Sequence, residues 1–117
     1  MTVDKNCLFC RIVGREIPAE ILLETNEVLA FKDIKPVAPV HLLVIPKEHV
    51  SGVDAVASAS RPVMEAVTRA ANELASRHGV ARSGYRLVIN SGDDAGQTVG
   101  HLHMHVLGGR PMAWPPG

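Results

Sequence analysis

Three histidines alternate with apolar residues in the stretch His-Leu-His-Met-His-Val-Leu at residues 101–107. In an extended strand successive side chains point to opposite faces, so His101, His103 and His105 are expected on one face and the apolar residues on the other. Packing gains nothing from three adjacent rings that can each take a proton and repel one another. The trio therefore predicts either metal ligation or phosphoryl chemistry by a nucleophilic ring.

A glycine-rich stretch, Gly-Gln-Thr-Val-Gly at residues 96–100, comes immediately before the histidines. Glycine lets backbone N–H groups come close to phosphate oxygens, so the stretch predicts a small anion-binding loop around Gly96, Gln97 and Thr98. Without the histidines beside it, the same stretch is more typical of an ordinary loop.

The two cysteines of the chain, Cys7 and Cys10, form a C-x-x-C motif. Such a turn presents two thiolates at a spacing suited to a tetrahedral metal ion, which needs two more ligands. No disulfide framework follows from two cysteines in a cytoplasmic chain. A thioredoxin-like redox pair is disfavoured because no βαβ pattern follows Cys10, and a pair of inert thiols stays open as the other alternative.

The composition limits the class of protein. The 117 residues fit one domain, predicted over residues 1–117 with a C-terminal tail at 108–117. Lys plus Arg (12) balance Asp plus Glu (12), which argues against a dedicated nucleic-acid or membrane-surface binder. The N-terminus lacks the apolar core of a signal peptide, and no apolar run approaches the roughly 18–20 residues that span a bilayer. We expect a cytoplasmic protein with no nucleic-acid and no membrane partner.

Short apolar runs predict strands, and turn residues or prolines separate them. A short helical turn is expected over residues 7–13, before Gly14. Residues 25–27 are turn formers, so the first two strands should form a hairpin. Pro46 should end the third strand, which is nearly continuous in apolar residues. The predicted strands are residues 21–24, 28–31, 41–45, 85–90 and 101–107.

One long helix is expected between the third and fourth strands. Ser60 can cap it, Pro62 suits its first turn, and Gly79 is a plausible left-handed terminator. Apolar residues recur at spacings of three and four along one stripe: Val63, Met64, Val67, Ala70, Ala71 and Leu74. The predicted fold is α+β, a five-stranded antiparallel sheet with this helix on one face and a short N-terminal helix.

These segments together resemble the histidine-triad superfamily. Residues 101–107 match its His-x-His-x-His-x-x signature, and residues 30–36, 43–49 and 110–117 are similar to its Hint branch. The resemblance runs from Cys7 to Gly117. It implies a hydrolase that cleaves the P–N bond of purine nucleoside 5′-phosphoramidates through a nucleotidyl-histidine intermediate.

The resemblance implies a role for each histidine of the reaction centre. His103 is the expected nucleophile, and its Nδ1–H needs a fixed acceptor, expected to be a backbone carbonyl. His105 should stabilise the phosphoryl oxygens or the bridging atom, and Thr98 stands where the family has a phosphate-binding serine. His41 should either orient His103 or contact the phosphate, with a satisfied strand-end histidine as the alternative.

The resemblance also implies the nucleotide contacts. Asp33 matches the acid that binds the ribose hydroxyls, although an aspartate after a strand is more often a turn or cap residue. Ile34 should lie against the purine. Asn90 matches a residue that contacts the phosphate or ribose, beside the loop that holds Gly96 and Gln97.

The C-x-x-C motif resembles that of many bacterial members of the branch. For these the resemblance implies a structural zinc ion held by Cys7, Cys10, His49 and His101. His101 would then belong to the metal site and not to the reaction.

The resemblance further implies a homodimer, with the long helix and the strand before it at a two-fold interface. Trp114 should reach toward the partner's active site, or else pack on its own subunit. Two other functions stay open: a nucleotide-binding or protein-interaction module with vestigial catalysis, and a copper or nickel protein that uses the three histidines as ligands.

Overall fold

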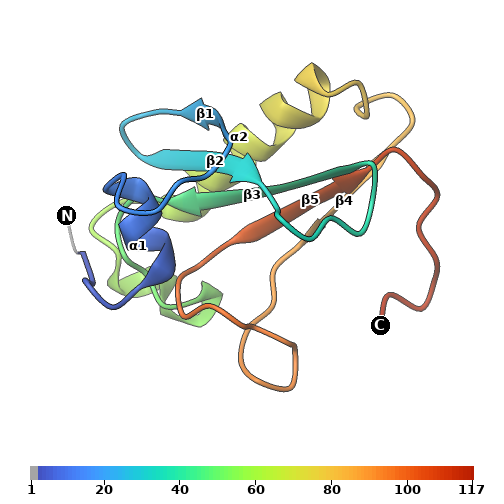
Figure 1. Cartoon of the computed structure of the whole chain (residues 1–117). Helices are drawn as coiled ribbons and strands as arrows, with labels where there is room; N and C mark the ends of the chain where they lie inside the picture. The colour runs from blue at the N-terminus through green and yellow to red at the C-terminus, as the bar shows by residue number, and fades with distance from the viewer. Residues whose placement is uncertain (1–2) are drawn as a thin grey trace.

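The strands form one antiparallel sheet in the order β1-β2-β3-β5-β4, and the computed structural model describes residues 3–117 (Figure 1). This is the α+β fold that the sequence predicts, with β1 and β2 paired as a hairpin. In chain order the elements are α1 (Leu8–Val13), β1 (Ile21–Glu24), β2 (Val28–Lys32), β3 (Val40–Pro46), the 3₁₀ helix η1 (Val53–Ser58), α2 (Val63–Arg77), β4 (Tyr85–Val88) and β5 (Met104–Gly108).

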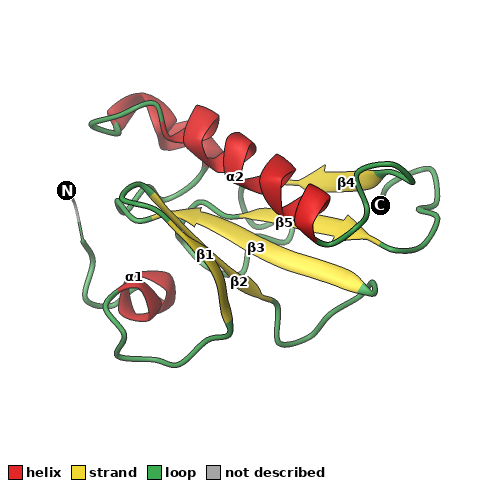
Figure 2. Ribbon diagram, turned by 90° about the horizontal axis from the view of Figure 1, so that it is seen from above, coloured by secondary structure: helices red, strands yellow, loops and turns green. Residues whose placement is uncertain are grey.

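The two α-helices lie on opposite faces of the sheet (Figure 2). The predicted apolar stripe of α2, including Val67, Ala71 and Leu74, is buried against one face. On the other face α1 packs through Phe9 against Phe31 and other apolar side chains of β2 and β3. The sheet therefore separates a wholly apolar layer from a layer that also contains the cysteines.

The alternation predicted for the histidine segment is confirmed by the packing of its apolar members. Met104 and Val106 lie in the core beneath α2, and Leu102 packs with Val63 at the start of that helix. The ring of His103 instead contacts Phe9 of α1, with their centroids 5.2 Å apart. The apolar members therefore anchor the segment while the histidines face the other layer.

The last strand is shorter than predicted, because β5 begins at Met104 and not at His101. Its pairing with β3 stops at Val44 opposite Met104. Before that point the chain leaves the sheet, and the N–H of Leu102 donates to the carbonyl of Val50 at 2.6 Å. This departure lets His101 turn toward the cysteines.

Two further predicted boundaries are wrong. Strand β4 ends at Val88, opposite His105, so Asn90 lies beyond the sheet. Ser60 does not cap α2, because its hydroxyl donates to the Glu48 carboxylate at 2.7 Å. The predicted helix terminator is confirmed, since Gly79 follows α2 with φ of 75°.

Strand β3 occupies the middle of the sheet and pairs with both β2 and β5. It is the strand that precedes α2; its expected place at a two-fold interface stays a prediction, but it has no free edge with which to extend the sheet into a partner subunit. Both of its edges are already hydrogen-bonded.

No helix within residues 3–117 has the length and apolar character needed to cross a membrane.

Leu74 offers a direct test of the layer beneath α2, because its side chain is fully buried. We expect Leu74→Ala to lower the free energy of unfolding by about 2–5 kcal/mol through lost burial and an unfilled cavity. Urea denaturation measures this change. The exposed Ser76 on the same helix provides the control, and Ser76→Ala should change stability by less than about 0.5 kcal/mol. Equal effects of the two substitutions would contradict the assigned packing.

Candidate active site

Four side chains from three distant parts of the chain converge beside α1. Their ligand atoms all lie within 4.8 Å of one another, and the residues are Cys7, Cys10, His49 and His101. The Nδ1 of His101 lies 3.3 Å from the sulfur of Cys7 and 3.6 Å from that of Cys10, and the Nδ1 of His49 lies 3.4 Å from the Cys10 sulfur. The four residues predicted as metal ligands are thus brought together.

The spacing and chemistry of this cluster fit a tetrahedral metal ion. A zinc ion with ordinary Zn–S and Zn–N bond lengths separates its sulfur and nitrogen ligands by about 3.5 Å, close to the distances found here. The Nε2–H of His101 donates to the carbonyl of Pro46 at 2.8 Å, which leaves Nδ1 with a lone pair facing the thiols. The cluster can therefore hold a metal ion.

The Cys10 sulfur is expected as a thiolate only beside a cation. Burial raises the pKa of Cys10 to about 11, so without a positive charge its thiol keeps its proton at neutral pH. Backbone N–H groups of Cys10 and Asp4 point at the sulfurs of Cys7 and Cys10, at 3.4 and 3.5 Å. A divalent ion would displace the protons, and these amides would then stabilise the thiolates.

His103 has one ring nitrogen held and the other open. Its Nδ1–H donates to the backbone carbonyl of His101 at 2.8 Å, which supplies the acceptor that the sequence could not identify. His103 is buried, but within residues 3–117 no fully buried side-chain nitrogen lacks a partner, so its unpartnered Nε2 keeps at least a small contact with solvent. A ring held in this way has its unprotonated nitrogen at Nε2, the atom that a nucleophilic histidine would use.

His41 hydrogen-bonds to His105 and not to His103. The backbone N–H of Val37 donates to the Nδ1 of His41 at 3.1 Å, so the proton of the neutral His41 ring is on Nε2. That Nε2–H lies 2.9 Å from the Nδ1 of His105 and 3.3 Å from the Asp33 carboxylate. The Nδ1 of His105 therefore accepts, and His105 carries its own proton on Nε2.

Burial keeps these two rings neutral. It lowers the pKa of His41 below its usual value, against the opposing effect of the Asp33 carboxylate. It also lowers the pKa of His105 to about 4, with smaller contributions from the neighbouring His103 and His41. At neutral pH His105 is thus an uncharged hydrogen-bond donor.

Asp33, His41 and His105 are also close enough to hold a metal ion. The Val37 amide argues against it, because a metal on the Nε2 of His41 would require a proton on Nδ1, where that amide already points. The three histidines of the 101–107 segment do not converge on one point either, since His101 faces the cysteines. The copper or nickel hypothesis therefore has no support in this geometry.

The glycine-rich loop is organised differently from the predicted anion-binding loop. The N–H of Gly96 donates to the carbonyl of Asp93 and that of Gln97 to Gly92, so both amides are used inside the loop. The Gln97 side-chain amide anchors the loop by donating hydrogen bonds to the carbonyls of Ser51 and Val99, at 2.8 and 3.1 Å. Gly96 and Gln97 thus shape the loop, and their amides are not free for phosphate.

Thr98, Asp33, Ile34 and Asn90 occupy different surroundings. Thr98 lines a hollow of about 380 Å³ that also touches Cys7 and the start of α1. One Asp33 oxygen accepts from the N–H of Lys35 at 2.8 Å, which is the turn role weighed for it, while the other faces His41. Ile34 is 91% exposed, and Asn90 is half-buried beyond β4.

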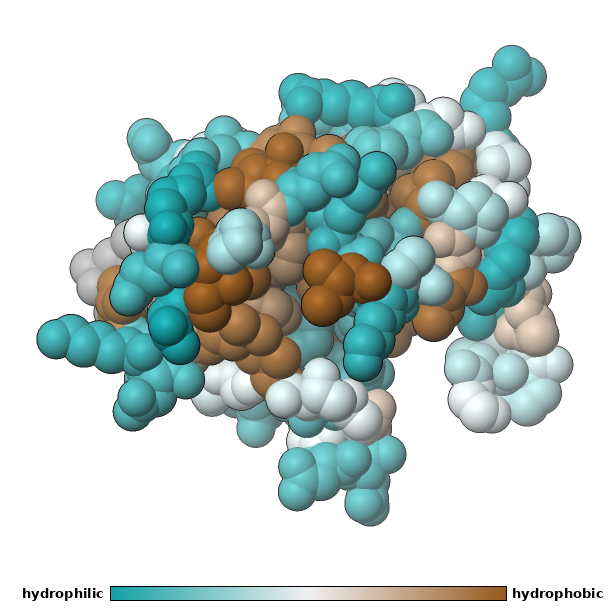
Figure 3. Space-filling model, viewed as in Figure 1, coloured by the Kyte–Doolittle hydropathy of each residue, from teal (hydrophilic) through white to brown (hydrophobic). Residues whose placement is uncertain are grey.

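The face that carries α1 has exposed apolar side chains. Leu8 of α1, with Ile34 and Val37 in the loop between β2 and β3, leaves a large apolar surface in contact with water. Figure 3 shows apolar side chains gathered over this face between polar ones. Apolar surface beside polar groups is what a base and its phosphate would contact.

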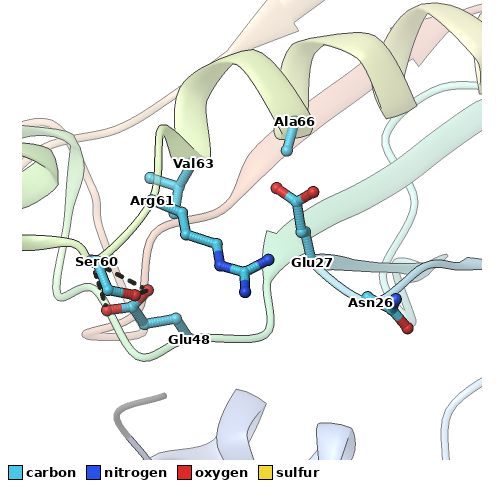
Figure 4. Close-up of a pocket in the computed structure, with 7 residues that line it drawn as sticks. All are labelled: Asn26, Glu27, Glu48, Ser60, Arg61, Val63 and Ala66. Atoms are coloured by element: carbon cyan, nitrogen blue, oxygen red, sulfur yellow. Dashed lines mark hydrogen bonds between the residues drawn. The ribbon is translucent and has the colours of Figure 1, made fainter.

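A second hollow, of about 360 Å³, lies at the start of α2 and is not lined by any histidine (Figure 4). There the Glu48 carboxylate accepts hydrogen bonds from the N–H and hydroxyl of Ser60, which lower its pKa. This pairing of the buried Glu48 with the exposed Ser60 fixes the connection into α2. The lining residues are Asn26, Glu27, Glu48, Ser60, Arg61, Val63 and Ala66.

Three backbone groups that organise the site could not be identified from the sequence, although a backbone carbonyl was expected as the acceptor for His103. They are the carbonyls of Pro46 and His101 and the N–H of Val37. Every residue type supplies such groups, so no residue type or spacing could have indicated them. The edge contact of Phe9 with both His101 and His103 was also missed.

Comparison with known proteins gives consistent matches over almost the whole chain. The family described as HIT domain matches residues 14–112. An uncharacterized HIT-like protein of Synechocystis is 45% identical over 113 residues, which cover 97% of this chain and 98% of that protein.

Two solved structures have the same fold. A HIT family hydrolase from Legionella pneumophila is 46% identical with a TM-score of 0.91, over 96% of this chain and 100% of that one. A HIT family hydrolase from Clostridium thermocellum is 47% identical with a TM-score of 0.91, over 95% and 96% of the two chains.

The lowered pKa of the half-buried His105 predicts a pH effect on stability. The unfolded chain takes up a proton on this residue below about pH 6.5, whereas the folded protein resists it until pH about 4. Acidification across this window therefore favours unfolding. His105→Gln cannot titrate and should lose less stability between pH 7 and pH 5, by about 1 kcal/mol because solvent screens this partly exposed ring.

Urea denaturation of both proteins at the two pH values measures this difference. His78→Gln, which removes a histidine outside the site, should behave like the parent protein. Identical losses in the parent and His105→Gln would contradict a buried neutral His105.

Proposed function

The chain belongs to the HIT domain family, and on that premise we propose that it hydrolyses the P–N bond of purine nucleoside 5′-phosphoramidates, as in the Hint branch. The observation that carries the proposal is the orientation of His103. Its Nδ1–H is held by the carbonyl of His101 at 2.8 Å, and its Nε2 is unpartnered and keeps some contact with solvent although the residue is buried. The HIT family hydrolases of similar structure support a hydrolytic activity.

In the first step the Nε2 of His103 attacks the α-phosphorus and the P–N bond breaks. The amine leaves with its bonding electron pair and takes up a proton, and the nucleotide is now bonded to Nε2. The ring becomes cationic, and the His101 carbonyl that accepts from Nδ1–H stabilises that charge. A neutral imidazole suits this step because it is both nucleophile and leaving group near pH 7.

In the second step water attacks the phosphorus, the bond to Nε2 breaks, and the nucleoside monophosphate is released with one proton. His105 acts in both steps through its Nε2–H, which donates to a phosphoryl oxygen or to the departing nitrogen. The pairing of its Nδ1 with His41 supports this assignment of the proton. Thr98 and Asn90 would add hydrogen bonds to the phosphate.

The nucleoside would lie along the loop between β2 and β3. We assign the ribose hydroxyls to Asp33 and the purine face to Ile34, whose 91% exposure leaves it free to pack against a base. Gly96 and Gln97 would act by shaping the loop that presents Thr98, since their own amides are already donated.

We propose zinc as the ion of the cysteine–histidine cluster. Two thiols and two imidazoles make a closed, all-protein ligand set of the kind found in structural zinc sites. The ion would supply a cross-link between the segment before α1, the segment after β3 and the segment before β5. His101 would thereby be held in place, and its carbonyl with it.

We also propose that the protein is a homodimer that associates through the solvent-facing side of α2. A shallow hollow there is lined by both apolar and polar side chains: Met64, Glu65, Thr68, Arg69 and Asn72. Trp114 is 82% exposed in the tail and would be free to contact the partner subunit.

The nucleophile can be identified by mass spectrometry after mixing with adenosine 5′-phosphoramidate. We expect a transient adenylyl adduct on the parent protein, none on His103→Ala, and turnover reduced about a thousandfold or more by that substitution. His78→Ala, which removes a histidine outside the site, should keep both adduct and turnover. Binding of the nucleotide without turnover by the parent protein would overturn the proposal and indicate a binding module.

The metal can be tested on protein purified without added metal. We expect about one zinc per chain by elemental analysis, retained in His78→Ala and lost in Cys10→Ser. Chelation should lower the melting temperature by about 10 °C or more, because binding energy of the ion is folding energy. Less than about half a zinc per chain with the thiols reduced would count against the site.

A further inference from the structure

Arg110, in the C-terminal tail, hydrogen-bonds to the loop between β2 and β3 through a single backbone carbonyl, that of Val37. Its Nη2–H and Nε–H both donate to the carbonyl of Val37, at 2.9 and 3.2 Å. Its Nη1–H donates to the carbonyl of Pro111 at 3.0 Å, which orients the guanidinium. The planar fork of arginine favours such a paired contact, which a lysine cannot reproduce.

The backbone conformation at the start of the tail allows this contact. Gly109 has φ of 89°, a left-handed conformation that favours glycine. A Cβ at this position would also meet the Cβ of Pro39 at 2.9 Å, so only glycine allows so close an approach to the loop. Figure 1 shows the tail turning back beside this loop after β5.

Val37 is held by hydrogen bonds and not by packing. Its side chain is 60% exposed, so little apolar contact fixes the residue. Its carbonyl accepts from Arg110 on one side, and its N–H donates to the Nδ1 of the buried His41 on the other. Loss of the guanidinium would leave that N–H free to move away from the ring.

We propose that Arg110 is a positioning residue that, by holding Val37 against His41, fixes the proton of His41 on Nε2 and thereby that of His105 on its outward-facing Nε2. The series of contacts is continuous: Arg110 to Val37, Val37 to His41 at 3.1 Å, and His41 to His105 at 2.9 Å. The consequence for turnover rests on the function proposed above, whereas the position of the protons does not.

The Asp33 carboxylate alone does not fix the position of the protons on His41 and His105. It lies 3.3 Å from the Nε2 of His41 and attracts its proton, but the same proton must reach His105. The Val37 amide orients the His41 ring so that Nε2 faces both partners. With the Val37 donor gone, the Nδ1 of His41 can carry the proton part of the time, and the Nδ1 of His105 is then free to carry a proton of its own.

The test uses protein labelled with ¹⁵N in its histidine rings, whose tautomers are read from long-range ¹⁵N–¹H spectra at neutral pH. In the parent protein we expect His41 and His105 each as a single Nε2–H tautomer. In Arg110→Ala both should become mixtures, and Arg110→Lys should be intermediate. Gly109→Ala, which keeps the guanidinium but blocks the approach of the tail, should resemble Arg110→Ala.

Arg86→Ala is the matched control, because Arg86 also anchors the tail, through the carbonyl of Ala113 at 2.9 Å, but does not touch Val37. Its ring tautomers should match those of the parent. With the phosphoramidate substrate, Arg110→Ala should lower kcat about tenfold with KM changed less than about threefold, and Arg86→Ala should change neither. Circular dichroism checks that each variant is folded.

Unchanged tautomers in folded Arg110→Ala would overturn the proposal even if turnover fell. The same tautomer mixture in Arg86→Ala would also overturn it, since general anchoring of the tail would then suffice. If the tautomers follow Arg110 but the parent protein hydrolyses no phosphoramidate, the positioning role stands and the proposed function fails.

Discussion

The hydrogen bond from the Nδ1–H of His103 to the carbonyl of His101 is the contact on which the site depends. It places the lone pair of His103 on the open side of the ring. The same residue that supplies the carbonyl turns its own ring away toward Cys7 and Cys10, and that ring is locked by the carbonyl of Pro46. His101 thus joins the cluster that can hold a metal ion to the proposed nucleophile His103, through its side chain on one side and its backbone on the other.

Backbone groups also set the protonation of the remaining histidines. Val37 offers a donor to His41, so the proton of that ring must face His105. Burial keeps both rings neutral, since water is the main stabiliser of an imidazolium ion and it is largely excluded here. Two neighbouring rings can therefore share one hydrogen bond without the repulsion that two charged rings would suffer.

The sheet keeps this chemistry apart from the apolar core. Leu102, Met104 and Val106 anchor the histidine segment in the layer beneath α2, where a change of volume affects packing. The histidines between them face the layer that holds α1. One face of this short segment thus packs in the core, and the other face carries the histidines that are available for chemistry.

Local periodicity and short motifs were enough to predict several features of this protein. These include the α+β architecture, the alternation around His103, the helix terminator at Gly79 and the resemblance to histidine-triad proteins. Contacts between distant segments determine where the chain leaves the sheet before Met104, that Ser60 hydrogen-bonds to Glu48, that the amides of Gly96 and Gln97 are already donated, and that His41 pairs with His105. Each of these depends on groups distant in the chain or on backbone atoms that every residue carries, so no local pattern of side chains encodes them.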